Sequence, residues 1–237
     1  MLYFTQIIVL FPIICVIYYI YIVGSTSINT ALVQLARYPI PHQVILSLLR
    51  EYKRPNDKIN ELVGEGVLTT VKKGLYIAGP ALKAGTPEPY LLANYIYGPS
   101  YVSLESALSF HGMIPEKVYE VSSMTTKATR AFDSNAGMYT YTRLPLPFYA
   151  YGIEQIRFSD KQTALIATKE KALCDKIVTT SGILLRSSSQ VLAYLLEDLR
   201  IDPSKLKELQ TGIINSWTKE SPKKSSIEIL IKALKKL

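Results

Sequence analysis

The stretch Lys53–Gly79, KRPNDKINELVGEGVLTTVKKGLYIAG, predicts a short basic helix followed by a tight two-stranded hairpin. Pro55 suits a first helical turn, and the helix should end at Gly64 and Gly66 because glycine favours helix C-termini. The apolar stripe of this helix consists of Ile59, Leu62 and Val63. Val67–Val71 is rich in β-branched residues, Lys73-Gly74 can form a turn, and Leu75–Ala78 returns as a second strand.

Two further helices are predicted upstream of this stretch. Ser25–Tyr38 has apolar residues at helical spacing, with Ser27 or Asn29 as its cap. Pro41 suits the first turn of a second helix that runs to about Glu51. Three helices followed by a hairpin form the plan of a winged helix-turn-helix, a module that binds duplex DNA. We therefore expect such a DNA-binding domain over residues 25–80.

In that module the third helix enters the major groove with its N-terminal half. The exposed positions there are Asn56, Asp57, Lys58 and Asn60; asparagine can pair with adenine, and lysine can donate to guanine. Lys53 and Arg54 precede the helix, where they would meet phosphates. Lys72 and Lys73 would place the hairpin tip against the DNA backbone. Any one of these charges also suits an ordinary solvated surface, so the prediction rests on their combination with the order of elements.

Composition favours a folded chain with an acidic partner. The 237 residues are 48% hydrophobic and carry a net charge of +8, which suits nucleic acid or an anionic membrane surface. The two cysteines, Cys15 and Cys174, form no metal-binding pattern and no disulfide framework. No P-loop, dinucleotide fingerprint or paired-carboxylate motif occurs, so we expect no cofactor, no metal and no enzymatic activity.

The first 24 residues form a separate apolar segment. Leu2–Val23 has no charged residue and is long enough to cross a bilayer core of about 30 Å as a helix. Pro12 interrupts the run, and no basic residue precedes it to set an orientation. Three interpretations stay open: a membrane anchor, an extension translated from upstream of the true start, or a buried element of the fold.

A second domain of mixed helices and strands is expected over residues 90–237, after a Gly/Pro-rich linker at 79–89. The predicted strands are Val118–Thr125, Tyr139–Arg143 and Tyr151–Phe158. The predicted helices are Pro89–Tyr97, Ser103–His111, Ala164–Val178, Ser188–Leu199, Pro203–Asn215 and a basic amphipathic helix at Ser226–Leu237. The fold class is therefore α+β.

Two segments of this domain are distinctive: Tyr101–Glu116, YVSLESALSFHGMIPE, and Ala167–Val178, ATKEKALCDKIV. Together with KKGLYIAGP at the hairpin, they resemble the AbiEi family of antitoxins, and the resemblance covers about residues 26–200. The chain departs from the family pattern at Lys169, where proline is usual, and at Cys174, where leucine is usual.

The resemblance implies a transcriptional regulator of a type IV toxin–antitoxin system. Members of that family bind inverted repeats through a winged helix-turn-helix and so repress their own operon. They also counteract a nucleotidyltransferase-like toxin, without the tight toxin-masking complex of other systems. The C-terminal antitoxin domain is associated with that action and with cooperative DNA binding.

The polar residues of the two segments have two possible roles. Tyr101, Glu105, Ser106 and His111 could form a functional surface, or they could cap and pack the predicted helix, with Ser103 as its N-cap. Glu170, Lys171 and Asp175 could form an internal salt bridge or bind a partner. Ser106 and His111 lie five residues apart without a nucleophile-elbow motif, which disfavours a serine hydrolase.

The leading hypothesis is thus a DNA-binding autorepressor and antitoxin in the cytoplasm. The alternative is a membrane-anchored protein whose remaining part binds a partner protein.

Overall fold

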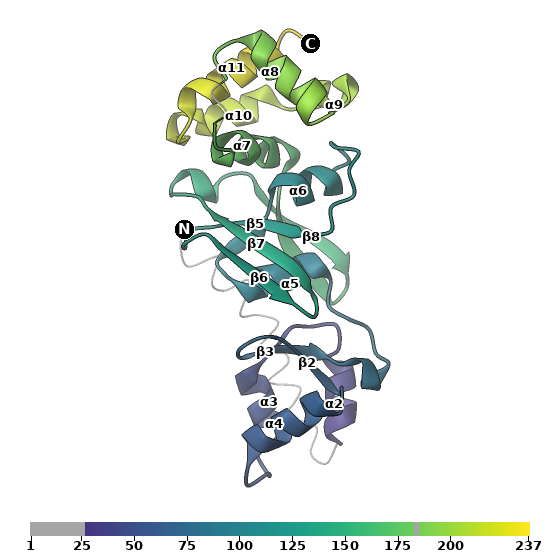
Figure 1. Ribbon diagram of the computed structural model, residues 1–237. Helices are drawn as coiled ribbons and strands as arrows, with labels where there is room; N and C mark the ends of the chain where they lie inside the picture. The colour runs from purple at the N-terminus through teal and green to yellow at the C-terminus, as the bar shows by residue number, and fades with distance from the viewer. Residues whose placement is uncertain (1–26, 183–184) are drawn as a thin grey trace. The chain divides into compact units, whose positions relative to one another are not determined.

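The computed structural model describes residues 27–182 and 185–237, and the chain divides into two compact units between Pro87 and Glu88 (Figure 1). This boundary lies within the predicted linker. We refer to residues 27–87 as the N-terminal unit and to residues 88–237 as the C-terminal unit. The apolar segment at residues 1–24 lies outside the described residues. Within the described part of the chain, no helix has the length and apolar character needed to cross a bilayer.

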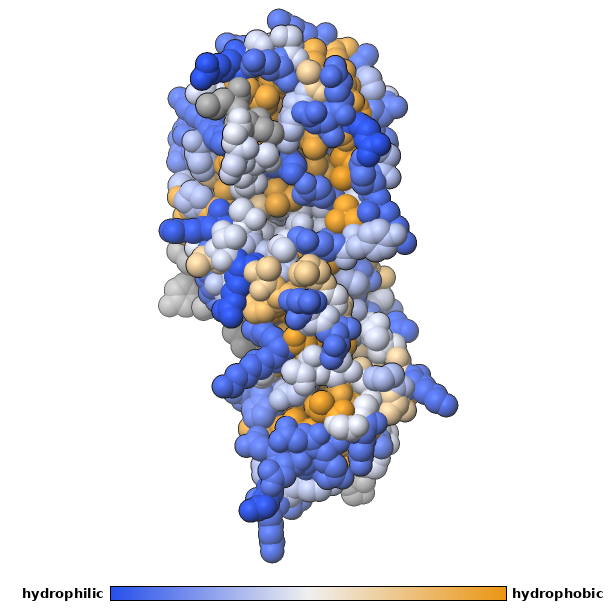
Figure 2. Space-filling model, in the orientation of Figure 1, coloured by the Kyte–Doolittle hydropathy of each residue, from blue (hydrophilic) through white to orange (hydrophobic). Residues whose placement is uncertain are grey.

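The N-terminal unit combines three helices with a small antiparallel sheet. The elements are α2 (Ile28–Gln34), β1 (Ile40–Pro41), α3 (His42–Leu48), α4 (Pro55–Gly64), β2 (Leu68–Lys72), β3 (Leu75–Ala78) and the 3₁₀ turn η1 (Pro80–Leu82). The sheet order is β1-β3-β2. Hydrophilic residues cover the outer side of α4 and the turn before it (Figure 2).

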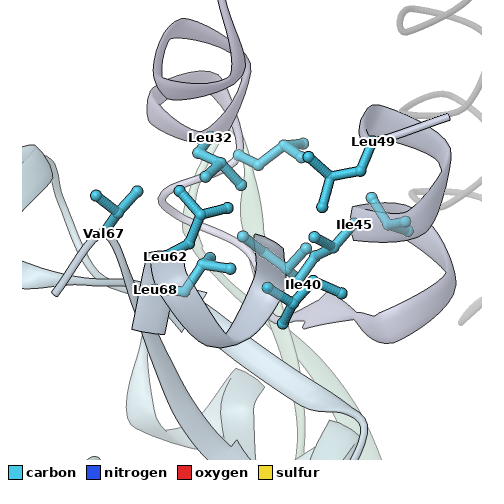
Figure 3. Close-up of a cluster of buried hydrophobic side chains, with 10 residues drawn as sticks. Leu32, Ile40, Ile45, Leu49, Leu62, Val67 and Leu68 are labelled. Atoms are coloured by element: carbon cyan, nitrogen blue, oxygen red, sulfur yellow. The ribbon is translucent and has the colours of Figure 1, made fainter. Parts of the chain in front are cut away.

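The helices of this unit are held by one hydrophobic cluster (Figure 3). Leu32 of α2, Ile45 of α3 and Leu62 of α4 are each at most 2% exposed and point into it. Val67 and Leu68 add the start of β2 to the same cluster. Burying a side chain of this size stabilises a fold by roughly 1.5–3 kcal/mol. The burial of the predicted apolar stripes therefore holds these helices together.

The bounds of the first two helices of the N-terminal unit, α2 and α3, differ from the prediction. The first helix begins after Ser27, whose hydroxyl accepts from the Thr30 amide, but it ends at Gln34 rather than Tyr38. Pro41 is the N-cap of α3 rather than its first residue, because Ile40 and Pro41 pair with β3 as a short strand. The predicted hairpin is confirmed, and Gly74 occupies its turn with φ of +82°, a conformation that glycine adopts at little cost.

The C-terminal unit contains a six-stranded mixed sheet in the order β6-β7-β5-β4-β9-β8. Its strands are β4 (Ser100–Val102), β5 (Val121–Thr125), β6 (Arg130–Ser134), β7 (Gly137–Arg143), β8 (Ile153–Ser159) and β9 (Gln162–Ala167). The pairs β4–β9 and β5–β7 are parallel, and the others are antiparallel. A short 3₁₀ turn, η2 (Phe148–Ala150), follows β7.

Helices flank this sheet and gather at one end of it (Figure 1). They are α5 (Pro89–Ile96), α6 (Leu104–Phe110), α7 (Lys169–Thr179), α8 (Ser188–Ala193), α9 (Pro203–Lys207), α10 (Thr211–Trp217) and α11 (Lys224–Leu234). A π-helical turn at Tyr194–Asp198 extends α8, and a 3₁₀ turn at Thr218–Glu220 follows α10. The basic helix α11 buries Ile227 and Leu230 and leaves Lys232 exposed, so its apolar face packs within the unit.

Two predicted helices of this unit were wrong, and two strands were missed. The predicted helix at Ala164–Val178 is β9 followed by α7, because Thr168 caps a helix that begins only at Lys169. The predicted helix at Pro203–Asn215 is divided into α9 and α10. Strands β4 and β6 were not predicted; β4 is short and buried, and β6 is polar. The coarser prediction of an α+β chain is confirmed.

Candidate nucleic-acid interface

The outward face of α4 carries polar side chains only. Ile59 and Leu62 point into the core at 2% exposure, whereas Asn56, Asp57, Asn60 and Glu61 are exposed. Helical geometry places residues three and four apart on one face, so these four side chains form a continuous polar row. We call this row the α4 face. It presents two amides and two carboxylates to solvent.

The cations predicted to contact DNA at α4 are paired with carboxylates of the same helix. The Arg54 guanidinium lies 3.4 Å from Asp57, and the Lys58 ammonium donates to Glu61 Oε1 at 2.5 Å. The side chain of Lys58 is only 21% exposed. The hydrogen bond to Glu61 raises the pKa of Lys58, so the amine stays protonated. Lys53 is exposed on the turn before the helix.

The hairpin tip presents the two remaining predicted cations. Lys73 is exposed and Lys72 is half-buried at the end of β2, next to the Gly74 turn. The Gly74 carbonyl accepts from the His42 amide at 3.0 Å, and β1 pairs with β3. The tip of the hairpin is thereby held against the start of α3.

Charge is distributed unevenly between these two elements. The stretch from Lys53 to Glu65 contains three cations and three carboxylates, so its net charge is zero. The cations are Lys53, Arg54 and Lys58, and the carboxylates are Asp57, Glu61 and Glu65. The hairpin tip has two lysines and no acidic residue. The spacing of three residues between Arg54 and Asp57, and between Lys58 and Glu61, is the sequence signal that indicates this pairing.

A second cluster joins the two distinctive segments of the C-terminal unit. Lys171 and Asp175 form a salt bridge across one turn of α7, with 2.6 Å between Nζ and Oδ1, and both side chains are fully buried. The hydroxyls of Tyr101 and Ser103 donate to the other oxygen of Asp175 at 2.9 and 2.8 Å. Lys171 also donates to the Phe148 carbonyl at 3.0 Å. We call these five residues the buried Lys–Asp cluster.

Burial shapes the proton affinities in this cluster. It raises the pKa of Asp175, while the hydrogen bonds from Lys171, Ser103 and Tyr101 oppose that shift. Burial likewise raises the pKa of Tyr101 well above its ordinary value, so its hydroxyl remains a donor. The predicted internal salt bridge between Lys171 and Asp175 is present. Ser103 lies at the N-cap position of α6, but its hydroxyl contacts Asp175 instead of capping the helix.

The other residues of the two segments also have partners inside the unit. The buried Ser106 hydroxyl donates to the Glu120 carbonyl and accepts from the Ser122 amide, both at 2.9 Å. Glu105 pairs with Lys176. His111 Nε2 lies 2.7 Å from the Ala167 carbonyl oxygen, and Glu170 accepts from the Gln210 amide at 3.1 Å. Their bonds tie α6 and α7 to neighbouring strands and loops, which is a structural role.

Comparison with known proteins adds no assignment: no family model matches the chain, and no curated protein matches it. Among the described residues, no group of histidine, cysteine and carboxylate side chains is arranged to hold a metal ion.

Proposed function

We propose that the N-terminal unit is a winged helix-turn-helix that binds duplex DNA. The observation that carries this proposal is the order α2, β1, α3, α4, β2, β3 with a three-stranded sheet β1-β3-β2 and a basic hairpin tip. In that module the helix before the hairpin enters the major groove. Here that helix is α4, whose outward row is polar throughout.

In this proposal the amides of the α4 face contact the bases. Asn56 and Asn60 are exposed, and an asparagine amide can donate to and accept from the edge of adenine. Lys53, Lys72 and Lys73 would neutralise phosphates, which positions the protein without reading sequence. Arg54 and Lys58 can contact phosphates only when their ion pairs with Asp57 and Glu61 are broken.

We further propose that the protein represses its own operon and acts as an antitoxin against a nucleotidyltransferase-like toxin. This part rests on the resemblance of the two segments to AbiEi antitoxins. In the buried Lys–Asp cluster, Tyr101 of one segment donates to Asp175 of the other. The two segments therefore build one domain, and direct contact with the toxin is not assumed.

DNA binding is tested with the double substitution Lys72→Ala, Lys73→Ala. Each lost phosphate contact lowers the slope of log K against log salt by about 0.9, so the slope should fall by about 1.8 for every duplex sequence. Lys235→Ala with Lys236→Ala is the matched control, because it removes the same charge from the exposed end of α11. An unchanged slope in the hairpin variant would contradict the proposal.

The amides are tested separately. Loss of a good base contact costs about 1–3 kcal/mol at the position it reads, so Asn56→Ala or Asn60→Ala should relax sequence preference while leaving the salt slope unchanged.

Antitoxin action is tested by co-expression with the product of the neighbouring gene, which should be toxic alone and tolerated with this protein.

A further inference from the structure

We propose that Asp57 and Glu61 are specificity-determining residues, which suppress binding to random DNA by holding Arg54 and Lys58 in ion pairs and by repelling phosphates. The inference rests on the proposed DNA-binding function and concerns how the same interface discriminates between sequences.

The geometry of the pairs is the first argument. Both pairs join residues three apart in sequence, with 3.4 Å between Arg54, the N-cap of α4, and Asp57, and 2.5 Å between Lys58 and Glu61 within the helix. Asp57 and Glu61 are themselves 66% and 52% exposed, so they lie on the surface that would face DNA. Arg54 and Lys58 are therefore already paired with an exposed carboxylate when a phosphate approaches α4.

The neighbours of the carboxylates are the second argument. Asp57 follows Asn56 and Glu61 follows Asn60, so each carboxylate shares the α4 face with an amide able to read a base. In a major groove of the right sequence, a carboxylate can accept from the amino group of cytosine or of adenine. Phosphates, guanine and thymine provide no such donor there. The acidic side chains thus find partners only on suitable sequences and are repelled elsewhere, which is how unfavourable contacts generate specificity.

The charge distribution of the unit is the third argument. Non-specific affinity for DNA comes almost entirely from phosphate neutralisation. The stretch Lys53–Glu65 has no net charge and contributes little of it, whereas the hairpin tip contains two lysines and no acidic residue. The division assigns phosphate affinity to the hairpin and sequence discrimination to α4.

The test uses the full chain with Asp57→Asn and Glu61→Gln, singly and together, which preserve side-chain shape and free one cation each. Binding to a random duplex and to the DNA upstream of the gene is measured by fluorescence anisotropy between 50 and 200 mM salt. Each freed cation that reaches a phosphate steepens the slope of log K against log salt by about 0.9, equivalent to about 3- to 4-fold in affinity over that range. The variants should bind random duplex more tightly and lose part of their preference for the upstream DNA.

Glu65→Gln is the matched control. It removes one negative charge from the C-terminal end of the same helix, but Glu65 belongs to neither ion pair. It should change the salt slope by clearly less than either test variant. Circular dichroism of all variants checks that the unit remains folded.

Two outcomes separate the inference from the function on which it rests. If the wild-type protein prefers its upstream DNA and the Asp57 and Glu61 variants keep both that preference and the wild-type salt slope, the inference is wrong and the function stands. If the wild-type protein binds upstream and random duplex equally, the proposed function fails and the inference fails with it.

Discussion

Replacing Lys171 by methionine should destabilise the C-terminal unit by several kcal/mol at neutral pH. The ammonium is fully buried, donates to Asp175 and to the Phe148 carbonyl, and lies 3.8 Å from the centre of the Phe148 ring. Methionine is unbranched and one atom shorter than lysine, so it keeps most of the apolar stem and removes the charge. Asp175 then keeps only the hydroxyls of Tyr101 and Ser103 as donors.

Breaking a buried ion pair by removing one partner costs about 3–5 kcal/mol. The lower end of that range applies here, about 3 kcal/mol, because two hydrogen bonds to the carboxylate survive. The double substitution Lys171→Met, Asp175→Asn removes the stranded charge and keeps an acceptor for both hydroxyls. It should be more stable than the single variant by about 1–2 kcal/mol, since no ion remains unpaired in the interior.

The dependence on pH follows from the position of Asp175. Burial raises the pKa of this carboxyl in the folded chain, and loss of Lys171 removes a group that opposes the shift. A carboxyl with a raised pKa takes up a proton more readily when folded than when unfolded. The protonated Asp175 carboxyl therefore contributes its full stabilisation below the ordinary carboxyl pKa. That stabilisation is lost as the pH rises through the pKa that the carboxyl has in the folded chain. The deficit of Lys171→Met should shrink as the solution is acidified.

Urea denaturation followed by tryptophan fluorescence measures these differences directly. Trp217 is the one tryptophan of the chain and is buried in α10, so its emission reports on the C-terminal unit. A cost below about 1 kcal/mol for Lys171→Met, or a double variant no more stable than the single one, would refute the reasoning.

Two other predictions concern the same unit. Gly152→Ala should destabilise it by clearly more than Gly112→Ala in urea denaturation: both positions have positive φ, but a Cβ at Gly152 would lie 2.6 Å from that of Lys171, whereas nothing lies within 4 Å at Gly112. Equal costs would show that the close approach is unimportant. Burial raises the pKa of the Cys174 thiol to about 12, so in a Cys15→Ser background it should resist alkylation at pH 8 until urea unfolds the unit; rapid labelling of the folded chain would contradict this.

The N-terminal unit was largely predictable because its signals are local. Pro55 at the start of α4, the Gly74 turn and the apolar stripe of Ile59 and Leu62 each depend on neighbouring residues, and all three are confirmed. The strand β1 was missed because a pair of residues gains strand geometry only by pairing with β3. Such long-range pairing leaves no periodic pattern in the sequence.

The C-terminal unit was predicted less completely for related reasons. Gln162–Ala167 continues into α7 without a glycine or proline, so the apolar run read as one helix, and only Thr168 marks the change. The contacts of Ser103 with Asp175 and of Lys171 with the Phe148 carbonyl join positions more than 20 residues apart. The position of Ser103 before α6 therefore predicted a helix cap, whereas its hydroxyl donates to Asp175 in the buried Lys–Asp cluster.

We propose that this protein reads duplex DNA through its N-terminal unit. The most direct measurement is competition between the duplex upstream of its own gene and a random duplex of equal length, at one salt concentration near 150 mM. We expect the upstream duplex to displace the random one, and Lys72→Ala with Lys73→Ala to weaken binding to both. Equal competition by the two duplexes would contradict it.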